Sequence, residues 1–339
     1  MNPIYWTLIY AVLASLVVFL SIKLSDYVDL LDKKTKVSGA LLGGILLAGV
    51  TSLPELFTSL TGTLIVGDNK LVLGNIMGSD FFDIMIFGVV YFLFFKKFTQ
   101  GKVGKQHYLT CFFTALMLIV VTVAAFVLNK NGWLLGWFNP MSFLIIIIYV
   151  LSVIFTPKTE EKEEPKEEVN CKWSVKQIWI LLAVFSLILI GASIGVTIVT
   201  EQIVNGFNIG HTFGGSLFLG VATSLPEVTA TISLCKKKNF DAAYGDILGS
   251  CVFNIIILAF ADAISFKAGP LYVINNDSFM LMIGTMITLA LTFVSILFIR
   301  SKFFKNDGKS RIILYSIATL LIASYLLYLV FSTSGVQLI

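Results

Sequence analysis

Long apolar segments dominate this sequence and leave few folds open to it. A spanning helix needs about 20 largely apolar residues, and ten segments meet that requirement. They cover 4–24, 38–66, 71–95, 107–128, 141–157, 177–200, 211–235, 241–264, 277–299 and 312–332, and the second is long enough to be two pieces. We predict an all-α membrane protein with ten transmembrane helices. Residues 1–20 have no basic start and no cleavage site, so we expect the first segment to be a retained helix.

The composition agrees with a membrane protein. Hydrophobic residues make up 57% of the chain and charged residues 13%, with a mean hydropathy of +0.91. Soluble domains carry roughly 25% charged residues, about twice as many. We therefore expect the lipid bilayer as a partner, and no nucleic acid.

The positive residues test the number of spans. If alternate loops face the same side, all but three of the 24 lysines and arginines fall on one side, the exceptions being Lys70, Lys130 and Lys267. Positive residues collect on the cytoplasmic side of a membrane. We predict a multi-pass plasma-membrane protein with both termini extracellular.

A charged stretch divides the chain into two halves. Residues 158–176 include TEEKEEPKEEVNCKW, which lacks apolar periodicity and is typical of a solvated linker. We predict a first five-span repeat over 1–157, a cytoplasmic linker over 158–176 and a second five-span repeat over 177–339.

Two motifs occur once in each half and in the same order. TSLPE occupies 51–55 and 223–227, while GNIMGSDFFD at 74–83 matches GDILGSCVFN at 245–254. Because five is odd, the second half starts on the opposite side of the membrane from the first. We therefore predict two inverted five-helix repeats, an arrangement in which transporters bind their substrate near the midplane.

The repeated TSLPE segment has the chemistry of a cation site. Glu55 and Glu227 lie inside apolar segments, where an ionisable residue is by default a functional candidate. Pro54 and Pro226 have no N–H, so the carbonyls of the residues four positions earlier lose their helical partners. These carbonyls belong to Val50 and Ala222, and the neighbouring hydroxyls to Thr51, Ser52, Thr223 and Ser224. Such an all-oxygen set suits a hard cation, either Na⁺ or Ca²⁺, which takes about 6–8 oxygens.

The second motif extends this set. Asn75, Ser79 and Asp83 fall one turn apart on one helix face, and the other half repeats the pattern with Asp246, Ser250 and Asn254. Asp83, with Glu55 and Glu227, brings a third acid toward one site, where bound cations or protons must compensate the charge.

Several residues have a structural interpretation as well. Asp80 is equally compatible with a structural and a ligand role, and Asp246 with a cap on the first turn of its helix. Gly39, Gly43, Gly210 and Gly214 have GxxxG spacing and are expected to serve close helix packing. We expect three of the four cysteines to be buried thiols and neither histidine to bind a metal.

The paired motifs resemble the α-repeats of the calcium/cation antiporter superfamily, and most of all its prokaryotic sodium/calcium exchanger type. The resemblance implies an antiporter that is not an enzyme and has no cofactor, with Ca²⁺ and Na⁺ as transported ions. It makes Glu55 and Glu227 shared ligands, with Asp83 and Asn254 facing the centre. It groups Ala48, Thr51, Ser79 and Glu55 in one sodium site, and Gly220, Thr223, Ser224, Ser250 and Glu227 in another.

The sequence departs from the family pattern at specific positions. Members of this type usually have Asn at the position of Asp83 and Asp at that of Asn254, and here the two are exchanged. Asp80 is an additional acid, and Val50 and Ala222 replace common glycines. These changes keep an alternative open, in which H⁺ is the coupling ion or another divalent ion such as Mn²⁺ or Mg²⁺ is carried.

Other classes fit less well. An intramembrane protease needs an HExxH motif or a matched aspartate pair, and the sequence has no HExxH and no convincing aspartyl motif. A passive channel does not need carboxylates that hold its ion closely. The oligomeric state and the stoichiometry do not follow from the sequence.

Overall fold

The computed structural model describes residues 3–34, 51–98, 103–128, 138–156, 173–266 and 270–334. Every regular element within these ranges is a helix, and none of them is a β-strand. The α-helices are α1 (Pro3–Lys34), α3 (Leu53–Thr61), α4 (Asn69–Phe98), α5 (Gln106–Val123), α7 (Met141–Phe155), α8 (Val175–Phe207), α9 (His211–Gly214), α10 (Val221–Lys236), α11 (Phe240–Ile264), α12 (Asn276–Arg300) and α13 (Gly308–Ser334). Three π-helices interrupt them: η2 (Gly62–Val66), η3 (Ala124–Leu128) and η4 (Gly215–Gly220).

Most of these helices have the length and polarity of membrane spans. Eight are long and apolar enough to cross a bilayer, and two shorter apolar helices, Leu53–Val66 and Met141–Phe155, accompany them in the described ranges. Large apolar side chains such as Val12, Leu187 and Ile312 point outward, as expected for a surface that faces lipid. The prediction of an all-α membrane protein is confirmed. The first part of the second predicted span, 38–50, lies outside the described residues.

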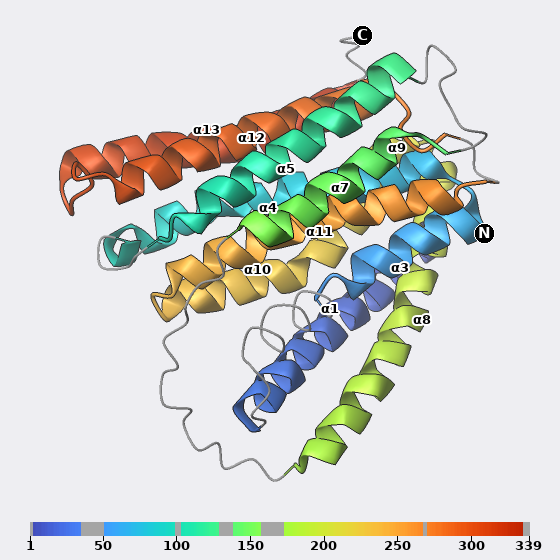
Figure 1. Ribbon diagram of the computed structural model, residues 1–339. Coiled ribbons are helices and arrows are strands. Elements are labelled where there is room, and N and C mark those ends of the chain that lie inside the picture. The colour runs from blue at the N-terminus through green and yellow to red at the C-terminus, as the bar shows by residue number, and fades with distance from the viewer. Residues whose placement is uncertain are drawn as a thin grey trace.

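Helix α4 lies among the other helices and organises the bundle (Figure 1). Most of the residues in its apolar central stretch are buried, a larger share than in any other of the eight spans. It packs against α10, α11, α12, α13 and η4. Its polar motif residues are therefore enclosed by protein instead of facing lipid: Asn75, Ser79, Asp80 and Asp83.

Glycines allow α4 and the α9–η4 segment to approach backbone to backbone. A Cβ added at Gly74 would lie 2.0 Å from the carbonyl oxygen of Thr212, and one added at Gly215 would lie 2.2 Å from that of Leu71. Real Cβ atoms do not come so close, so only glycine permits this contact. The packing prediction also holds at Gly214, where a Cβ would lie 2.2 Å from Val204 Cγ2.

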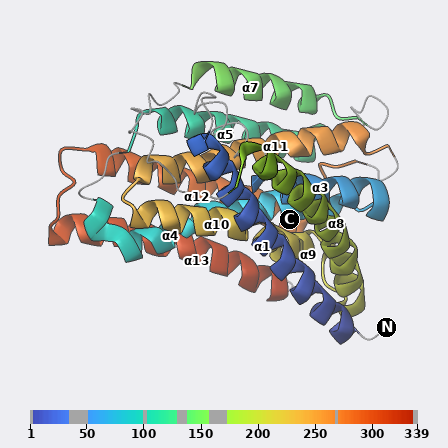
Figure 2. The same ribbon diagram turned by 90° about the horizontal axis from the view of Figure 1, so that it is seen from below.

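Helices α1 and α8 form a second body that crosses the rest of the bundle (Figure 2). They pack against each other through their own apolar cluster, which includes Leu20, Leu24, Ile178 and Leu189. The main apolar core is a separate cluster. Helix α1 touches α10, and α8 touches α3, so each of the two contacts a helix that carries a TSLPE segment.

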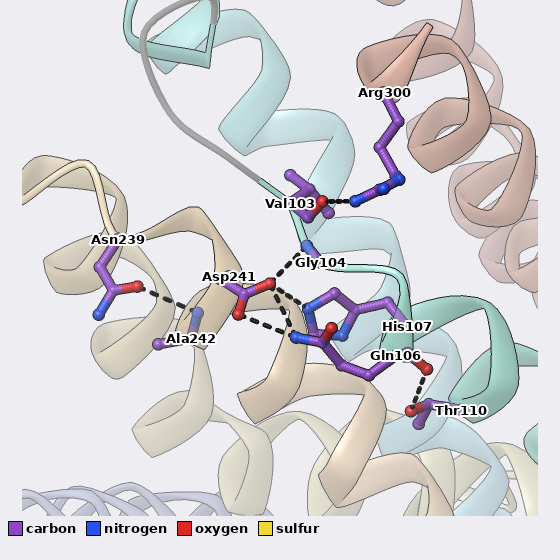
Figure 3. Close-up of polar contacts among 9 residues, drawn as sticks. All are labelled: Val103, Gly104, Gln106, His107, Thr110, Asn239, Asp241, Ala242 and Arg300. Atoms are coloured by element: carbon purple, nitrogen blue, oxygen red, sulfur yellow. Dashed lines mark hydrogen bonds and ion pairs between the residues drawn. The ribbon is translucent and has the colours of Figure 1, made fainter. Parts of the chain in front are cut away.

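A polar cluster ties the start of α5 to the start of α11 (Figure 3). The carboxylate of Asp241 accepts hydrogen bonds from the Gly104 N–H at 2.6 Å and from Gln106 Nε2 at 2.9 and 3.0 Å, and it lies 2.8 Å from His107 Nε2. Alongside, Arg300 donates to the carbonyl of Val103. His107 thus pairs with an acid, and His211 does the same with Asp68.

Substitution of Gly215 tests the close contact between η4 and α4. We expect Gly215→Ala to destabilise the protein by about 1–3 kcal/mol, because the added methyl group forces the two backbones apart. The measurement is the melting temperature of the purified protein in detergent. Gly191→Ala in α8 is the control, since a Cβ there meets no atom within 4 Å. Equal melting temperatures for both variants would contradict this account of the packing.

Substitution of Asp241 tests the polar cluster. Asp241→Ala leaves the Gly104 N–H, Gln106 and the buried His107 without their acceptor, which we expect to cost about 1–3 kcal/mol. The control is Asp26→Ala, because Asp26 pairs with Lys23 at an exposed position where an ion pair contributes little. Denaturant or thermal unfolding in detergent measures both variants. A loss no larger than that of the control would show that the cluster does not stabilise the fold.

Candidate cation site

The first TSLPE segment lies at a helix break. Ser52 has a non-helical backbone, with φ −89° and ψ 10°, and α3 begins at the next residue, Leu53. Pro54 falls in the first turn, where its missing N–H costs nothing. Glu55 therefore sits in the first turn of α3, where the helix dipole favours a negative charge. The second predicted span is indeed interrupted here.

The second TSLPE segment is built differently. Helix α10 runs from Val221 to Lys236 straight through Pro226, and the irregular backbone lies just before it, in the π-helix η4. Pro226 still offers no N–H to the carbonyl of Ala222. The two prolines therefore differ in their setting, because Pro54 lies in the first turn of α3 and Pro226 lies inside α10. Val50 and Ala48 lie outside the described residues.

The two glutamates are buried, and most of their oxygens have no partner. Glu55 and Glu227 are each 1% exposed. Both carboxylate oxygens of Glu227 and Oε2 of Glu55 form no hydrogen bond within the described ranges. Glu55 lies beside the hydroxyl of Thr223, which belongs to the other TSLPE segment. The side chains of the two segments thus meet, and the two glutamates are close enough for their charges to interact.

The second motif adds two more buried acids from α4. Asp80 and Asp83 are 0% and 1% exposed, and both interact electrostatically with Glu55. Asp83 lies beside Ser224, and its Oδ1 has no partner in the described part of the chain. Glu55, Glu227, Asp83 and Asp80 therefore share one interior region. The sequence predicts the first three, and Asp80 is the additional one.

Contacts between the two motif pairs recur in equivalent positions. Asn75 Nδ2 lies 3.3 Å from Ser59 Oγ, and in the other half the Thr231 hydroxyl donates to Asp246 over 3.2 Å. Helix α11 begins at Phe240 with Asn239 as its N-cap. Asp246 is therefore not the cap of the first turn, and its contact with Thr231 places it at the edge of the acidic region.

Hydroxyl and carbonyl oxygens surround these acids. Ser79 Oγ donates to the carbonyl of Gly220 at 3.2 Å and lies 3.3 Å from the Thr223 hydroxyl, so it contacts the second TSLPE segment. Ser250 donates instead to the carbonyl of Ile247 in its own helix. The remaining polar residues expected at the site are all buried: Thr51, Ser52, Ser224 and Asn254.

No positive side chain neutralises the acids. In the described ranges the ion pairs involve other residues, and none contains Glu55, Asp80, Asp83 or Glu227. Within the same residues, no three His, Cys, Asp or Glu side chains come close enough together to hold a metal ion. A cation here would need amide, hydroxyl and carbonyl oxygens besides carboxylates. That mixture suits a hard cation and not a soft metal.

Some residues near the site were not expected from the sequence. Thr58 accepts a hydrogen bond from Asn75 at 2.9 Å and itself donates to the carbonyl of Pro54 at 2.8 Å. Thr58 follows Glu55 by three residues, so the sequence could have placed the two side chains on the same helix face. Asp262, near the end of α11, accepts hydrogen bonds from the Asn139 N–H at 2.9 Å and the Ser142 hydroxyl at 2.7 Å, and so anchors α7.

Comparison with known proteins gives the family. A sequence profile described as sodium/calcium exchanger protein matches residues 5–156 and 176–334. Inner membrane protein YrbG of Escherichia coli strain K12 is 25% identical over 251 residues, 72% of this chain and 74% of that protein. A crystal structure of the H⁺/Ca²⁺ exchanger CAX has a TM-score of 0.63 at 14% identity and covers 99% of this chain and 91% of that one.

A structure of the sodium-calcium exchanger NCX_Mj, soaked with Na⁺ and Sr²⁺, has a TM-score of 0.54 at 18% identity. It covers 97% of this chain and 99% of that one. The described helices and the buried acidic region define a multi-pass membrane transporter of cations. The chain belongs to the sodium/calcium exchanger protein family, within the calcium/cation antiporter superfamily. The resemblance stated from the two motif pairs is thereby confirmed.

Neutralising either glutamate tests the site. We expect Glu55→Gln and Glu227→Gln each to reduce cation exchange to background, because each removes a buried charge that a bound cation would compensate. Ion flux into vesicles containing the purified protein measures this. Glu201→Gln in α8, at a partly exposed position, is the control. Exchange that persists in either glutamate variant would remove that residue from the site.

Proposed function

We propose that this chain is a secondary antiporter that exchanges Ca²⁺ for Na⁺ across the plasma membrane by alternating access. The observation that carries the proposal is the group of four buried acids that no positive side chain neutralises within the described ranges. Charges in a low-dielectric interior require a compensating cation or proton. A site that must be filled in every state favours exchange over one-way release.

The proposed ligands are those predicted from the motifs. Glu55 and Glu227 would bind both ions, and Asp83 and Asn254 would face the centre. The supporting oxygens would come from Thr51, Ser52, Ser79, Thr223, Ser224, Ser250, Ala48, Gly220, Val50 and Ala222. The contact between Ser79 and Thr223 links the two predicted sodium sites through neighbouring hydroxyls.

Alternating access requires part of the protein to move. The polar site side chains that the structure describes are at most 6% exposed, so an ion reaches them only after a rearrangement. Helices α1 and α8 suit this movement, because their own apolar cluster lets them move as a pair. Tyr10 of α1 donates to the carbonyl of Phe218 in η4 at 2.6 Å, which connects the pair to the site.

The proposed topology is ten spans in two inverted five-helix repeats, with both termini outside. The repeated contacts of Asn75 with Ser59 and of Asp246 with Thr231 support equivalent halves. The charge distribution of the loops supports the orientation.

Proton coupling is the second candidate, and Asp80 is the observation that favours it. Buried carboxyls without a positive partner are groups that bind protons readily. The similar structures include both a sodium-calcium exchanger and an H⁺/Ca²⁺ exchanger. Transport of Mn²⁺ or Mg²⁺ belongs to the same alternative.

The coupling ion is tested by ⁴⁵Ca²⁺ uptake into vesicles under imposed gradients. We expect an outward Na⁺ gradient to drive uptake, and an equal K⁺ gradient to leave it at the level without a gradient. A proton gradient applied without Na⁺ is the second arm, and competition by Mn²⁺ and Mg²⁺ the third. Uptake that follows the proton gradient and ignores sodium would overturn sodium coupling in favour of the alternative.

A further inference from the structure

Asp80 makes a defined contact that the motif analysis does not account for. Its Oδ1 accepts a hydrogen bond from Nδ2 of Asn254 at 2.9 Å, which joins α4 to α11. It also lies beside the thiol of Cys251 on α11. Both Asp80 and Asn254 are buried, at 0% and 1% exposure.

This contact determines which way the Asn254 amide points. An asparagine side chain has a donating NH₂ end and an accepting oxygen end, whereas a carboxylate only accepts. The NH₂ end must therefore face Asp80, and the oxygen end must face elsewhere. That oxygen, Oδ1 of Asn254, is buried and has no hydrogen-bond partner in the described part of the chain. A buried amide oxygen without a donor is suited to accept a cation.

Asn75 shows the same arrangement independently. Its Nδ2 donates to Thr58 Oγ1 at 2.9 Å and approaches Ser59 Oγ at 3.3 Å. Its Oδ1 is likewise buried and has no partner among the described residues. Both motif asparagines are thus held by their nitrogen and leave their oxygen free.

The repeat explains why only one half needs the additional acid. Position 80 corresponds to Cys251, and Asn254 corresponds to Asp83. A carboxylate has two equivalent accepting oxygens, so Asp83 presents oxygen in either orientation and Cys251 need not fix it. An amide has two different ends, and in one of its two orientations it would turn its NH₂ group toward the cation. The acid at position 80 holds the amide of Asn254, whereas the other motif amide, Asn75, is held by Thr58 and Ser59.

We propose that Asp80 is a positioning residue that acts through Asn254, holding its amide oxygen toward the transported cation. The proposal rests on the cation site of the proposed function and adds a role for a residue outside its ligand set. It separates Asp80 from the acids that bind the ion themselves. The simplest competing role is direct ligation by the Asp80 carboxylate, which the experiment must distinguish.

The test is a double-mutant cycle on cation affinity, measured by calorimetry on the purified protein with Ca²⁺, Mn²⁺ and Na⁺ in turn. We expect Asp80→Asn to weaken binding about tenfold, since an amide at position 80 lets Asn254 adopt either orientation. We expect Asn254→Ala to weaken it similarly, and the double variant Asp80→Asn with Asn254→Ala to be no weaker than Asn254→Ala alone. Additive losses would overturn the proposal and indicate direct ligation or a general structural role.

A swapped pair supplies the rescue. The double variant Asp80→Asn with Asn254→Asp exchanges the two side chains. Its carboxylate at position 254 presents an oxygen to the cation in either orientation and accepts a hydrogen bond from the amide at position 80. We expect its affinity to return to within about threefold of the wild type, with a melting temperature close to that of Asp80→Asn alone. Failure of rescue would contradict the proposal.

Use of three ions keeps the two proposals distinct. If the wild type binds Mn²⁺ but not Ca²⁺, calcium exchange is refuted. The double-mutant cycle can then be measured with the affinity for Mn²⁺. A wild type that binds none of the three ions would overturn both.

Discussion

Carboxylates that share an apolar interior repel one another and lose the water that would stabilise their charge, so everything near them must supply compensation. In this chain Glu55, Asp80, Asp83 and Glu227 lie together with no positive side chain paired to them in the described ranges. The amides of Asn75 and Asn254 form their hydrogen bonds through nitrogen, and their oxygens have no partner among the described residues. Such an arrangement costs stability unless a cation or a proton compensates the charge.

The close contact between α4 and η4 holds half of this site in place. Gly74, Gly215 and Gly220 let the two backbones meet, and Ser79 then reaches the Gly220 carbonyl and the Thr223 hydroxyl directly. Helices α1 and α8 have a core of their own and touch the helices that carry the TSLPE segments. A further apolar cluster, which includes Leu71 of α4, Val196 of α8 and Leu219 of η4, joins these two helices to the site.

Much of this could be predicted from the sequence, because hydropathy and a repeated motif are local signals. The apolar segments, the burial of Glu55 and Glu227 and the family followed from them. The pairing of Asp80 with Asn254 did not, since periodicity assigns a residue to a face of its own helix but not to a partner on another. The same limit hid the contacts of His107 with Asp241 and of Asn75 with Thr58. The different settings of Pro54 and Pro226 could not be predicted either, because the two TSLPE segments are identical in sequence.

The π-helix η4 lies where the spacing before TSLPE differs by one residue between the two halves. GGILLAGV is followed directly by Thr51, whereas GGSLFLGV is followed by Ala222 and only then by Thr223. A helix accommodates such an additional residue by a wider turn, which is what a π-helix provides. Each residue turns a regular helix by about 100°, so without the wider turn everything after Ala222 would be rotated away from its present face. The two identical TSLPE segments therefore present their glutamates from different settings, at the start of α3 in one half and within α10 in the other. An ion at the site would therefore meet a different helical framework in each half of the chain.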